Sequence, residues 1–159
     1  MKAALLILLF LLINLPNTYG AEPRFSGEPL PRFAALAREH ISSRVGPSIK
    51  YPVKYEYHSK FQPVQIINEY YGWYQIKDKT GDISWVHKSQ ISKNSYAITI
   101  YNKTKLYAKP KLTAEILAFV DKGAIFRVGE CSSGFCEVDT NFNNIHYSGY
   151  ILTDNLWGV

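Results

Sequence analysis

The sequence predicts an all-β protein made of two tandem small β-barrels that follow a cleaved signal peptide. The main observation is an internal repeat, because residues 36–91 and 98–157 carry the same landmarks in the same order. Each copy has a Pro-marked loop, a pair of apolar strands, a Gly–aromatic turn and an aromatic–aliphatic exit. A composition with 12 Tyr, 8 Phe and 3 Trp also favours strands over helices. The sequence therefore predicts two copies of one small all-β unit.

The spacing between matching landmarks is nearly constant. The offsets are 63, 62 and 65 residues for the pairs Pro47/Pro110, Gly72/Gly134 and Trp85/Tyr150. Small drifts of this kind are typical of loop insertions between fixed strands. We expect a hairpin loop at 78–82, with Gly81 where a positive φ is needed. The matching Asn-rich loop at 140–144 is expected to be longer, which accounts for the increase in offset from 62 to 65 residues.

The residues that open the first unit allow two interpretations. Residues 33–40 could form two helical turns, with Ala34 and Ala37 on one face. A strand fits the repeat better, because the apolar stretch at 97–101 holds the matching place in the second unit. The sequence therefore predicts a strand here.

The first twenty residues are predicted to be a secretory signal peptide. Lys2 precedes an uninterrupted apolar run at 3–13, and small residues stand near Gly20, where an export peptidase would cleave. The alternative is a membrane anchor, but this run is shorter than the roughly 20 residues that cross a bilayer. The mature protein is therefore expected to be periplasmic or secreted, with no stable membrane insertion.

The chain after residue 20 divides into three parts. Residues 21–31 hold three of the eight prolines and are expected to form an extended arm, with Phe25 able to pack on the first barrel. Residues 32–93 and 96–159 are the two predicted barrels. Because only two residues join them, the barrels are expected to touch.

The net charge of the chain is mild. Cleavage after residue 20 removes Lys2 and leaves 17 basic and 13 acidic residues, or about +4. Dispersed charge of this size in an exported protein excludes nucleic acid as a partner.

Several stretches match one bacterial family in order. They are Pro31-Arg-Phe33, Ile41-Ser-Ser-Arg-Val-Gly-Pro47, Tyr51-Pro-Val-Lys-Tyr55, Pro63-Val-Gln-Ile-Ile67, Trp85-Val-His87 and Asn155-Leu-Trp-Gly158. The chain resembles the bacterial SH3-like (SH3b) domains, small β-barrels of exported and cell-wall-associated proteins, and more narrowly the tandem-SH3 exported family of unknown function. The resemblance implies two SH3-like barrels. The second copy departs further from the pattern, since Tyr107 and Lys109 replace the Arg and the Gly of the first loop.

The two cysteines stand in one turn of the second unit. Cys131 and Cys136 flank a four-residue loop between paired strands, so their Cα atoms can lie within the roughly 4.4–6.8 Å of a disulfide. Export provides an oxidising compartment in which such a bond persists. A zinc site is disfavoured because two Cys do not fill a tetrahedral shell and His146 is the one His nearby in sequence. A catalytic thiol is disfavoured because it prefers a helix N-terminus. A disulfide is therefore predicted.

No catalytic, metal or cofactor site is predicted. The four His are scattered with no two at ligand spacing, and the acids, Glu69 among them, are expected in loops or on outer strand faces. The sequence holds neither a Gly-rich phosphate loop nor a Ser nucleophile elbow. We therefore expect a protein that is not an enzyme and uses no cofactor.

The first unit concentrates aromatic side chains. The residues predicted to bind a ligand are Arg44, Tyr55, Tyr57, Tyr71, Trp73 and Trp85. In this interpretation Tyr57, Tyr71 and Trp85 line a shallow groove. Arg44 stands at one edge of the groove, and such surfaces bind extended peptides or sugar rings by stacking. The alternative is that the rings are half-exposed barrel residues without a ligand, with Trp73 in the core.

Two functions are compatible with an exported, aromatic, mildly basic protein. The preferred one is a non-catalytic binding module for a cell-envelope ligand, with peptidoglycan as the leading candidate because of the family resemblance. The alternative is an interaction or assembly factor that binds a Pro-rich or extended peptide of another envelope protein. In that case residues 21–31 could fold back as an intramolecular ligand.

Overall fold

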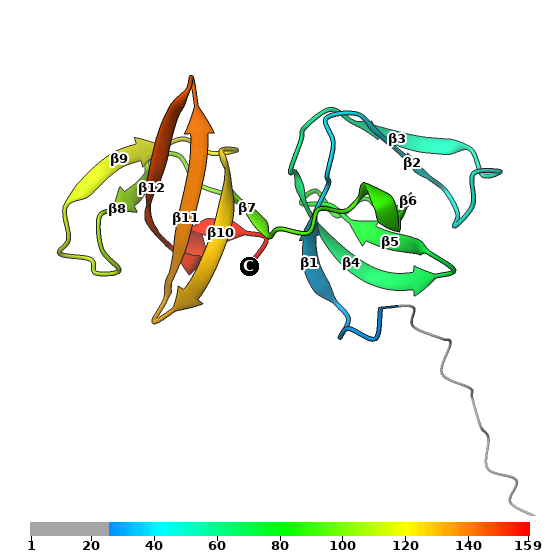
Figure 1. The fold of residues 1–159 in the computed structure, drawn as a ribbon, viewed down its shortest axis with the longest axis horizontal. Coiled ribbons are helices and arrows are strands. Elements are labelled where there is room, and N and C mark those ends of the chain that lie inside the picture. The colour runs from blue at the N-terminus through cyan, green and yellow to red at the C-terminus, as the bar shows by residue number, and fades with distance from the viewer. Residues whose placement is uncertain (1–25) are drawn as a thin grey trace, which may run out of the picture.

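The computed structural model describes residues 26–159. The predicted signal peptide and the first part of the predicted arm, including Phe25, lie outside the described residues. Two β-structures stand side by side and are joined by a short connection that leads into β7 (Figure 1). None of the helices in this part of the chain is long and apolar enough to span a membrane.

The first barrel is a six-stranded antiparallel sheet with the order β1-β4-β5-β6-β2-β3. Its elements are β1 (Arg32–Ala35), β2 (Ile41–Arg44), β3 (Val53–Tyr57), β4 (Pro63–Tyr70), β5 (Trp73–Lys77), β6 (Ile83–His87) and the short 3-10 helix η1 (Lys88–Gln90). The predicted opening strand is confirmed over the helical alternative. It ends at Ala35, and the next residue, Leu36, forms an isolated bridge with Ile91.

The second barrel repeats this arrangement in a seven-stranded sheet with the order β13-β7-β10-β11-β12-β8-β9. Its elements are β7 (Tyr96–Thr99), β8 (Thr104–Tyr107), β9 (Ile116–Val120), β10 (Ile125–Ser132), β11 (Phe135–Phe142), β12 (Ile145–Leu152), the 3-10 helix η2 (Thr153–Asn155) and β13 (Leu156–Trp157). Apart from β13, the strands follow the same order as in the first barrel. The predicted duplication into two tandem barrels is therefore confirmed.

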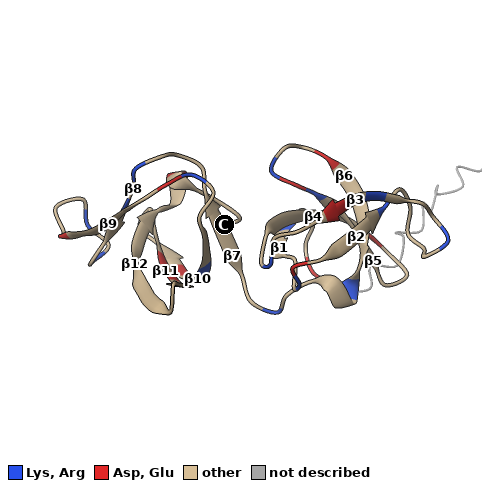
Figure 2. Cartoon of the chain, turned by 90° about the horizontal axis from the view of Figure 1, so that it is seen from above, with Lys and Arg blue, Asp and Glu red and all other residues tan. Residues whose placement is uncertain are grey.

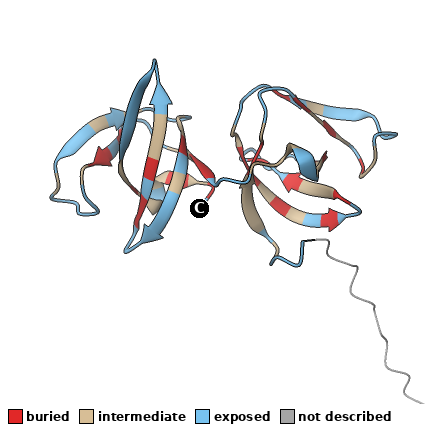
Figure 3. Ribbon diagram, viewed as in Figure 1, coloured by how far each residue is buried: buried red, intermediate tan, exposed pale blue. Residues whose placement is uncertain are grey.

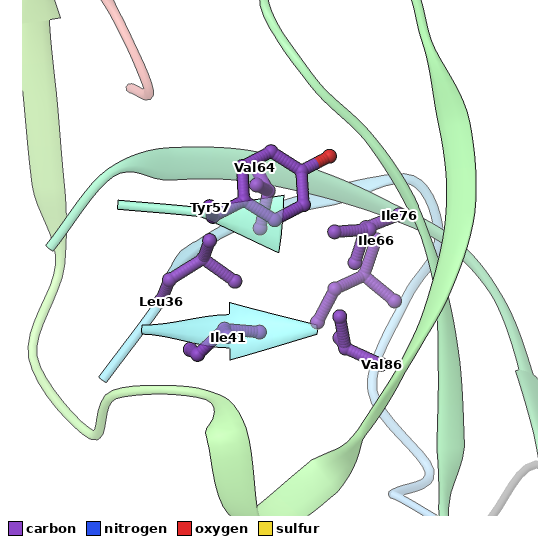
Figure 4. Packing of buried hydrophobic residues seen from close by; sticks show 7 residues of the cluster. All are labelled: Leu36, Ile41, Tyr57, Val64, Ile66, Ile76 and Val86. Atoms are coloured by element: carbon purple, nitrogen blue, oxygen red, sulfur yellow. The ribbon is translucent and has the colours of Figure 1, made fainter. Parts of the chain in front are cut away.

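Each barrel has its own small core, in which apolar side chains from alternate strand positions meet. The first core contains Leu36, Ile41, Tyr57, Val64, Ile66, Ile76 and Val86, and Figure 4 shows the Tyr57 ring among the aliphatic side chains. The second contains Ala97, Leu106, Phe126, Cys136, Val138, Ile151 and Leu156. Buried residues lie along the inner parts of the strands, while β9 and the tip of the β11–β12 hairpin are largely exposed (Figure 3).

The predicted disulfide is present. Cys131 and Cys136 are directly opposite each other on β10 and β11, with an S–S distance of 2.04 Å and Cα atoms 4.0 Å apart. The loop is shorter than expected, because the strands continue to Ser132 and Phe135. Only Ser133 and Gly134 remain in the turn, both with positive φ, which matches the twist of two-residue hairpins. The bond occupies both thiols of the chain and excludes the zinc and catalytic alternatives for them.

The expectation of a longer loop at 140–144 is wrong. Residues 140–142 belong to β11 and pair with residues 145–147 of β12. The turn consists of Asn143 and Asn144, at φ 50° and 62°. Asn tolerates this left-handed conformation better than most residues, so an Asn pair makes a tight turn and the additional residues lengthen the strands.

The two barrels touch through aromatic side chains, as expected from their short connection. Phe61 stacks on Tyr96 with ring centroids 4.1 Å apart and planes inclined by 5°. Phe33 meets Trp157 edge-on at 5.2 Å. Gly158 permits the close approach, because a Cβ there would lie 3.1 Å from the Cβ of Pro63 in the first barrel and 2.6 Å from the Tyr96 carbonyl oxygen of its own barrel. In the first barrel the contact involves β1 and the segment just before β4, and in the second barrel it involves β7 and β13.

Replacing Phe61 by Ala is expected to uncouple the barrels. The variant loses the stacked pair, whose geometry contributes about 1 kcal/mol beyond the buried area. Heat capacity scans should then resolve two unfolding transitions, and NMR relaxation should give each barrel its own tumbling time. Phe119→Ala, at an exposed Phe on β9, is the matched control and should unfold as the wild type does. Unchanged coupling in Phe61→Ala would mean that the connection alone holds the barrels together.

Candidate ligand-binding grooves

The first barrel carries an open hollow of about 460 Å³ with aromatic walls. Its lining residues are Pro47, Tyr51, Asn68, Glu69, Tyr70 and Trp85. They come from the loop between β2 and β3, the end of β4 and the middle of β6. Tyr51 and Tyr70 are 46% and 42% exposed, so both side chains are accessible to a ligand in the hollow.

The loop between β2 and β3 is held in place by Arg44 and Gly46. The Arg44 guanidinium donates from Nη1 to the Tyr51 carbonyl oxygen at 2.7 Å. Gly46 lies directly beneath the Tyr51 ring, since a Cβ at this position would be 2.7 Å from the ring carbon Cγ. Arg44 also pairs with Trp85 across β2 and β6. The Gly-Pro segment therefore positions the Tyr51 ring over the hollow.

The second barrel has a different hollow, of about 480 Å³, with mainly apolar walls. Its lining residues are Leu106, Ala118, Phe119, Val120, Asp121, Ala124, Ile125, Phe126, Thr140, Phe142 and Tyr147. It lies between β9 and the end of the β11–β12 hairpin. Phe119 and Phe142 are 63% and 64% exposed. Figure 2 shows no charged residue along β9 or β12, whereas Lys residues occur in the loops beside β8.

The edge strands of the two barrels differ in charge. β3 and β9 occupy the same place in the sheet order, and each pairs with one neighbour only. β3 carries Lys54 and Glu56, and charges of this kind discourage pairing with another chain. β9 reads Ile-Leu-Ala-Phe-Val and has none. The second barrel therefore presents an apolar edge that the first lacks.

A family model described as "Bacterial SH3 domain" matches residues 39–93 and, separately, residues 101–158. The chain belongs to the bacterial SH3 domain family. Among solved structures it is similar to NlpC2 from Trichomonas vaginalis, with 17% identity over 80% of this chain and 48% of that one, at a TM-score of 0.36. It is also similar to NlpC1 from the same organism, with 18% identity over 82% of this chain and 47% of that one, at a TM-score of 0.36. The chain spans about half the length of these structures. No curated protein sequence matches it.

The six predicted ligand residues of the first SH3 domain do not all gather at the hollow. Trp85 lines it, and Arg44 supports it from below. Tyr71 is 65% exposed in the β4–β5 turn and meets Tyr70 edge-on at 4.7 Å. Trp73 is half-buried on β5 and packs edge-on against His87 at 5.5 Å. Neither residue is among those that line the hollow.

The tyrosines of β3 have structural surroundings. Tyr57, expected in the groove, is only 7% exposed and forms part of the core, and this burial raises its pKa. It points inward because it pairs with buried Ile41. The Tyr55 hydroxyl donates to Asp82 at 2.9 Å, and this bond raises the pKa of the phenol. Lys54 lies over the Tyr55 ring, 5.1 Å from its centroid.

Sequence reasoning missed two exposed rings and misplaced one acid. Tyr51 and Tyr70 line the hollow, and the Gly-Pro pair before Tyr51 was the one signal of a structured loop. Glu69, expected on an outer face, has a fully buried side chain. The cause is a bulge in β4 between Ile66 and Asn68. The additional residue in the bulge reverses the inward–outward alternation of the side chains along β4. Glu69 therefore points to the inner side of the barrel, as does its cross-strand partner Tyr74.

The buried carboxylate of Glu69 is ionised and paired. Its carboxylate accepts from the Ser26 amide at 3.0 Å and the Ser26 hydroxyl at 2.7 Å, and lies 2.7 Å from Arg32 Nη1. Burial by itself would raise the pKa of Glu69, but the bonds from Ser26 and Arg32 outweigh it and lower the pKa below the ordinary 4.5. Ser26 thus ties the described end of the arm to the domain.

Replacing Glu69 by Gln is expected to destabilise the protein in a pH-dependent way. A folded pKa below 4.5 means that ionised Glu69 stabilises the fold above this pH, and that the contribution disappears as pH falls through the folded value. At pH 7 the variant should lose about 1.5–3 kcal/mol of unfolding free energy. Urea titrations should show that the difference in unfolding free energy between wild type and Glu69→Gln becomes smaller at acidic pH. Glu56→Gln, at an exposed carboxylate on β3, should show little change, and a gap independent of pH would contradict the assignment.

Proposed function

We propose that the protein is a non-catalytic, periplasmic or secreted module that binds a cell-envelope ligand, with peptidoglycan as the ligand class. The observation that carries the proposal is the hollow of the first SH3 domain, where Tyr51, Tyr70 and Trp85 surround an open space. Aromatic faces bind the apolar faces of sugar rings and the backbone of extended peptides by stacking and van der Waals contact. Peptidoglycan offers both.

The charge around the hollow fits an anionic polymer. The carboxylate of Glu69 is paired with Arg32 and covered by Ser26, so it does not present an unpaired negative charge to a ligand. Lys50 is the basic side chain on the loop that carries Tyr51, and Arg44 is the last residue of β2, directly before this loop. A mildly basic rim of this kind favours the carboxylates of peptide stems and weakens in salt.

Replacing Trp85 by Ala is expected to reduce retention of the mature protein on purified, insoluble peptidoglycan by at least tenfold. Loss of one stacked ring in a binding centre costs about 1.4 kcal/mol or more. Co-sedimentation at moderate salt measures the affinity, and circular dichroism verifies the fold. Tyr101→Ala, at an exposed Tyr of the second SH3 domain, should bind like the wild type. Absence of wild-type retention, or equal retention of Trp85→Ala, would argue against peptidoglycan at this hollow.

A second candidate function rests on the second SH3 domain. Its apolar hollow lies beside the uncharged edge strand β9, and an extended peptide can add to such an edge by main-chain hydrogen bonds. Apolar side chains of the peptide would enter the hollow at alternate positions. The partner is therefore an extended, apolar segment of another envelope protein, which makes the chain an interaction or assembly factor.

A photo-crosslinking residue in place of Leu117 on β9 discriminates between the two functions. An assembly factor should give one discrete crosslinked envelope protein, and Phe119→Ser should abolish the product while Trp85→Ala leaves it intact. In a cell-wall module, Trp85→Ala should reduce sedimentation with peptidoglycan and Phe119→Ser should leave it unchanged. A crosslink between two copies of this chain, with a dimer in ultracentrifugation, would overturn the assembly function and identify β9 as a self-association edge.

A further inference from the structure

Two histidines that are far apart in the sequence form a pair on the first SH3 domain. The Nδ1 atoms of His40 and His58 lie 3.1 Å apart, and their ring centroids are 5.3 Å apart with planes inclined by 75°. Both residues are exposed. Their spacing of 18 residues along the sequence gave no indication of this proximity.

Strand register brings the pair together. Ile41 and Tyr57 are the first pair of the β2–β3 ladder, and His40 and His58 are the residues just beyond this pair, one before Ile41 and one after Tyr57. Side chains alternate between the two faces of a strand, and both Ile41 and Tyr57 point into the core. The histidines therefore share the outer face and lie directly opposite each other, where cross-strand side chains interact most closely.

We propose that His40 and His58 form a two-histidine chelate for a divalent transition metal of the Cu²⁺, Ni²⁺ and Zn²⁺ class. Metal–nitrogen distances of about 2.0–2.1 Å separate two ligand nitrogens by about 3.3 Å at a tetrahedral angle and about 2.9 Å at a right angle. The observed 3.1 Å lies between these values. Neutral imidazole is the side chain that these metals prefer, whereas Mg²⁺ and Ca²⁺ prefer oxygen.

The pair needs only a tautomer change to receive the ion. In the metal-free protein one Nδ1–H donates to the other Nδ1. When the donor ring carries its proton on Nε2 instead, both Nδ1 lone pairs face the space between the rings. Two neutral imidazoles then bind one ion without a net release of protons from the rings.

The remaining coordination positions are open. Among residues 26–159 no group of three or more His, Cys, Asp or Glu side chains gathers for a metal. Water or a donor from a bound partner would therefore complete the shell. An exposed two-ligand site on the outer face of β2 and β3 leaves both the core and the aromatic hollow unaltered.

The test is a titration of the untagged mature protein with CuCl₂, NiCl₂ and ZnCl₂, followed by calorimetry. We expect one equivalent of each metal to bind, with Cu²⁺ bound most tightly. His40→Ala and His58→Ala should each weaken binding by at least about tenfold, because loss of even an indirect supporting group costs this much. His146→Ala, at an exposed His of the second domain, is the matched control and should bind like the wild type.

A second measurement locates the ion and does not depend on affinity. Cu²⁺ should broaden the NMR amide signals of Ile41 and Tyr57 before those around His146, and its electron paramagnetic resonance spectrum should show coupling to two imidazole nitrogens. Either single variant should remove that two-nitrogen pattern. Absence of a stoichiometric metal, or wild-type affinity in both His40→Ala and His58→Ala, would overturn the proposal and leave the pair as a hydrogen-bonded contact.

Discussion

The first SH3 domain depends on one strand pairing, that of Arg44 on β2 with Trp85 on β6. This is the one residue pair that joins β2 and β6 in register, and it attaches the β2–β3 hairpin to the rest of the sheet. The hairpin supplies Ile41 and Tyr57 to the core, and its loop supplies Tyr51 to the hollow. The end of the hairpin opposite this loop brings the two histidines together. The core, the hollow and the histidine pair therefore all depend on the β2–β3 hairpin.

The second SH3 domain uses the equivalent pairing for a different surface. Tyr107 on β8 pairs with Tyr150 on β12, at the positions that match Arg44 and Trp85. Because Tyr107 stands where the first domain has Arg44, the β8–β9 hairpin has no guanidinium that could bind a loop carbonyl. Aromatic contacts stabilise it instead, such as Tyr107 against Phe135, with ring centroids 5.7 Å apart. Long β11 and β12 strands extend past the barrel, and β9 faces them across an apolar hollow. One architecture thus carries an aromatic, partly polar hollow in one copy and an apolar hollow with an open edge in the other.

The contact between the domains limits how the two surfaces can act. Phe61 stacked on Tyr96 and Phe33 against Trp157 hold β7 and β13 of the second domain against the first, and the connection allows little separation. The apolar hollow is lined by β9 and the tip of the β11–β12 hairpin, and β9 lies on the side of the second barrel away from the first (Figure 1). A ligand that spans both hollows must therefore be long or polymeric, whereas two short ligands would bind independently.

The sequence by itself determined the duplication, the β class and the disulfide, because these depend on local patterns: landmark order, strand alternation and two cysteines beside one turn. Tertiary structure decided the sites. A bulge in β4 turned Glu69 inward against the simple alternation of period two, and strand pairing placed Tyr57 in the core. Register between β2 and β3 set His40 against His58 across 18 residues of sequence. Bulges and register are properties of pairs of strands, and a single chain read along its length contains no signal that fixes them.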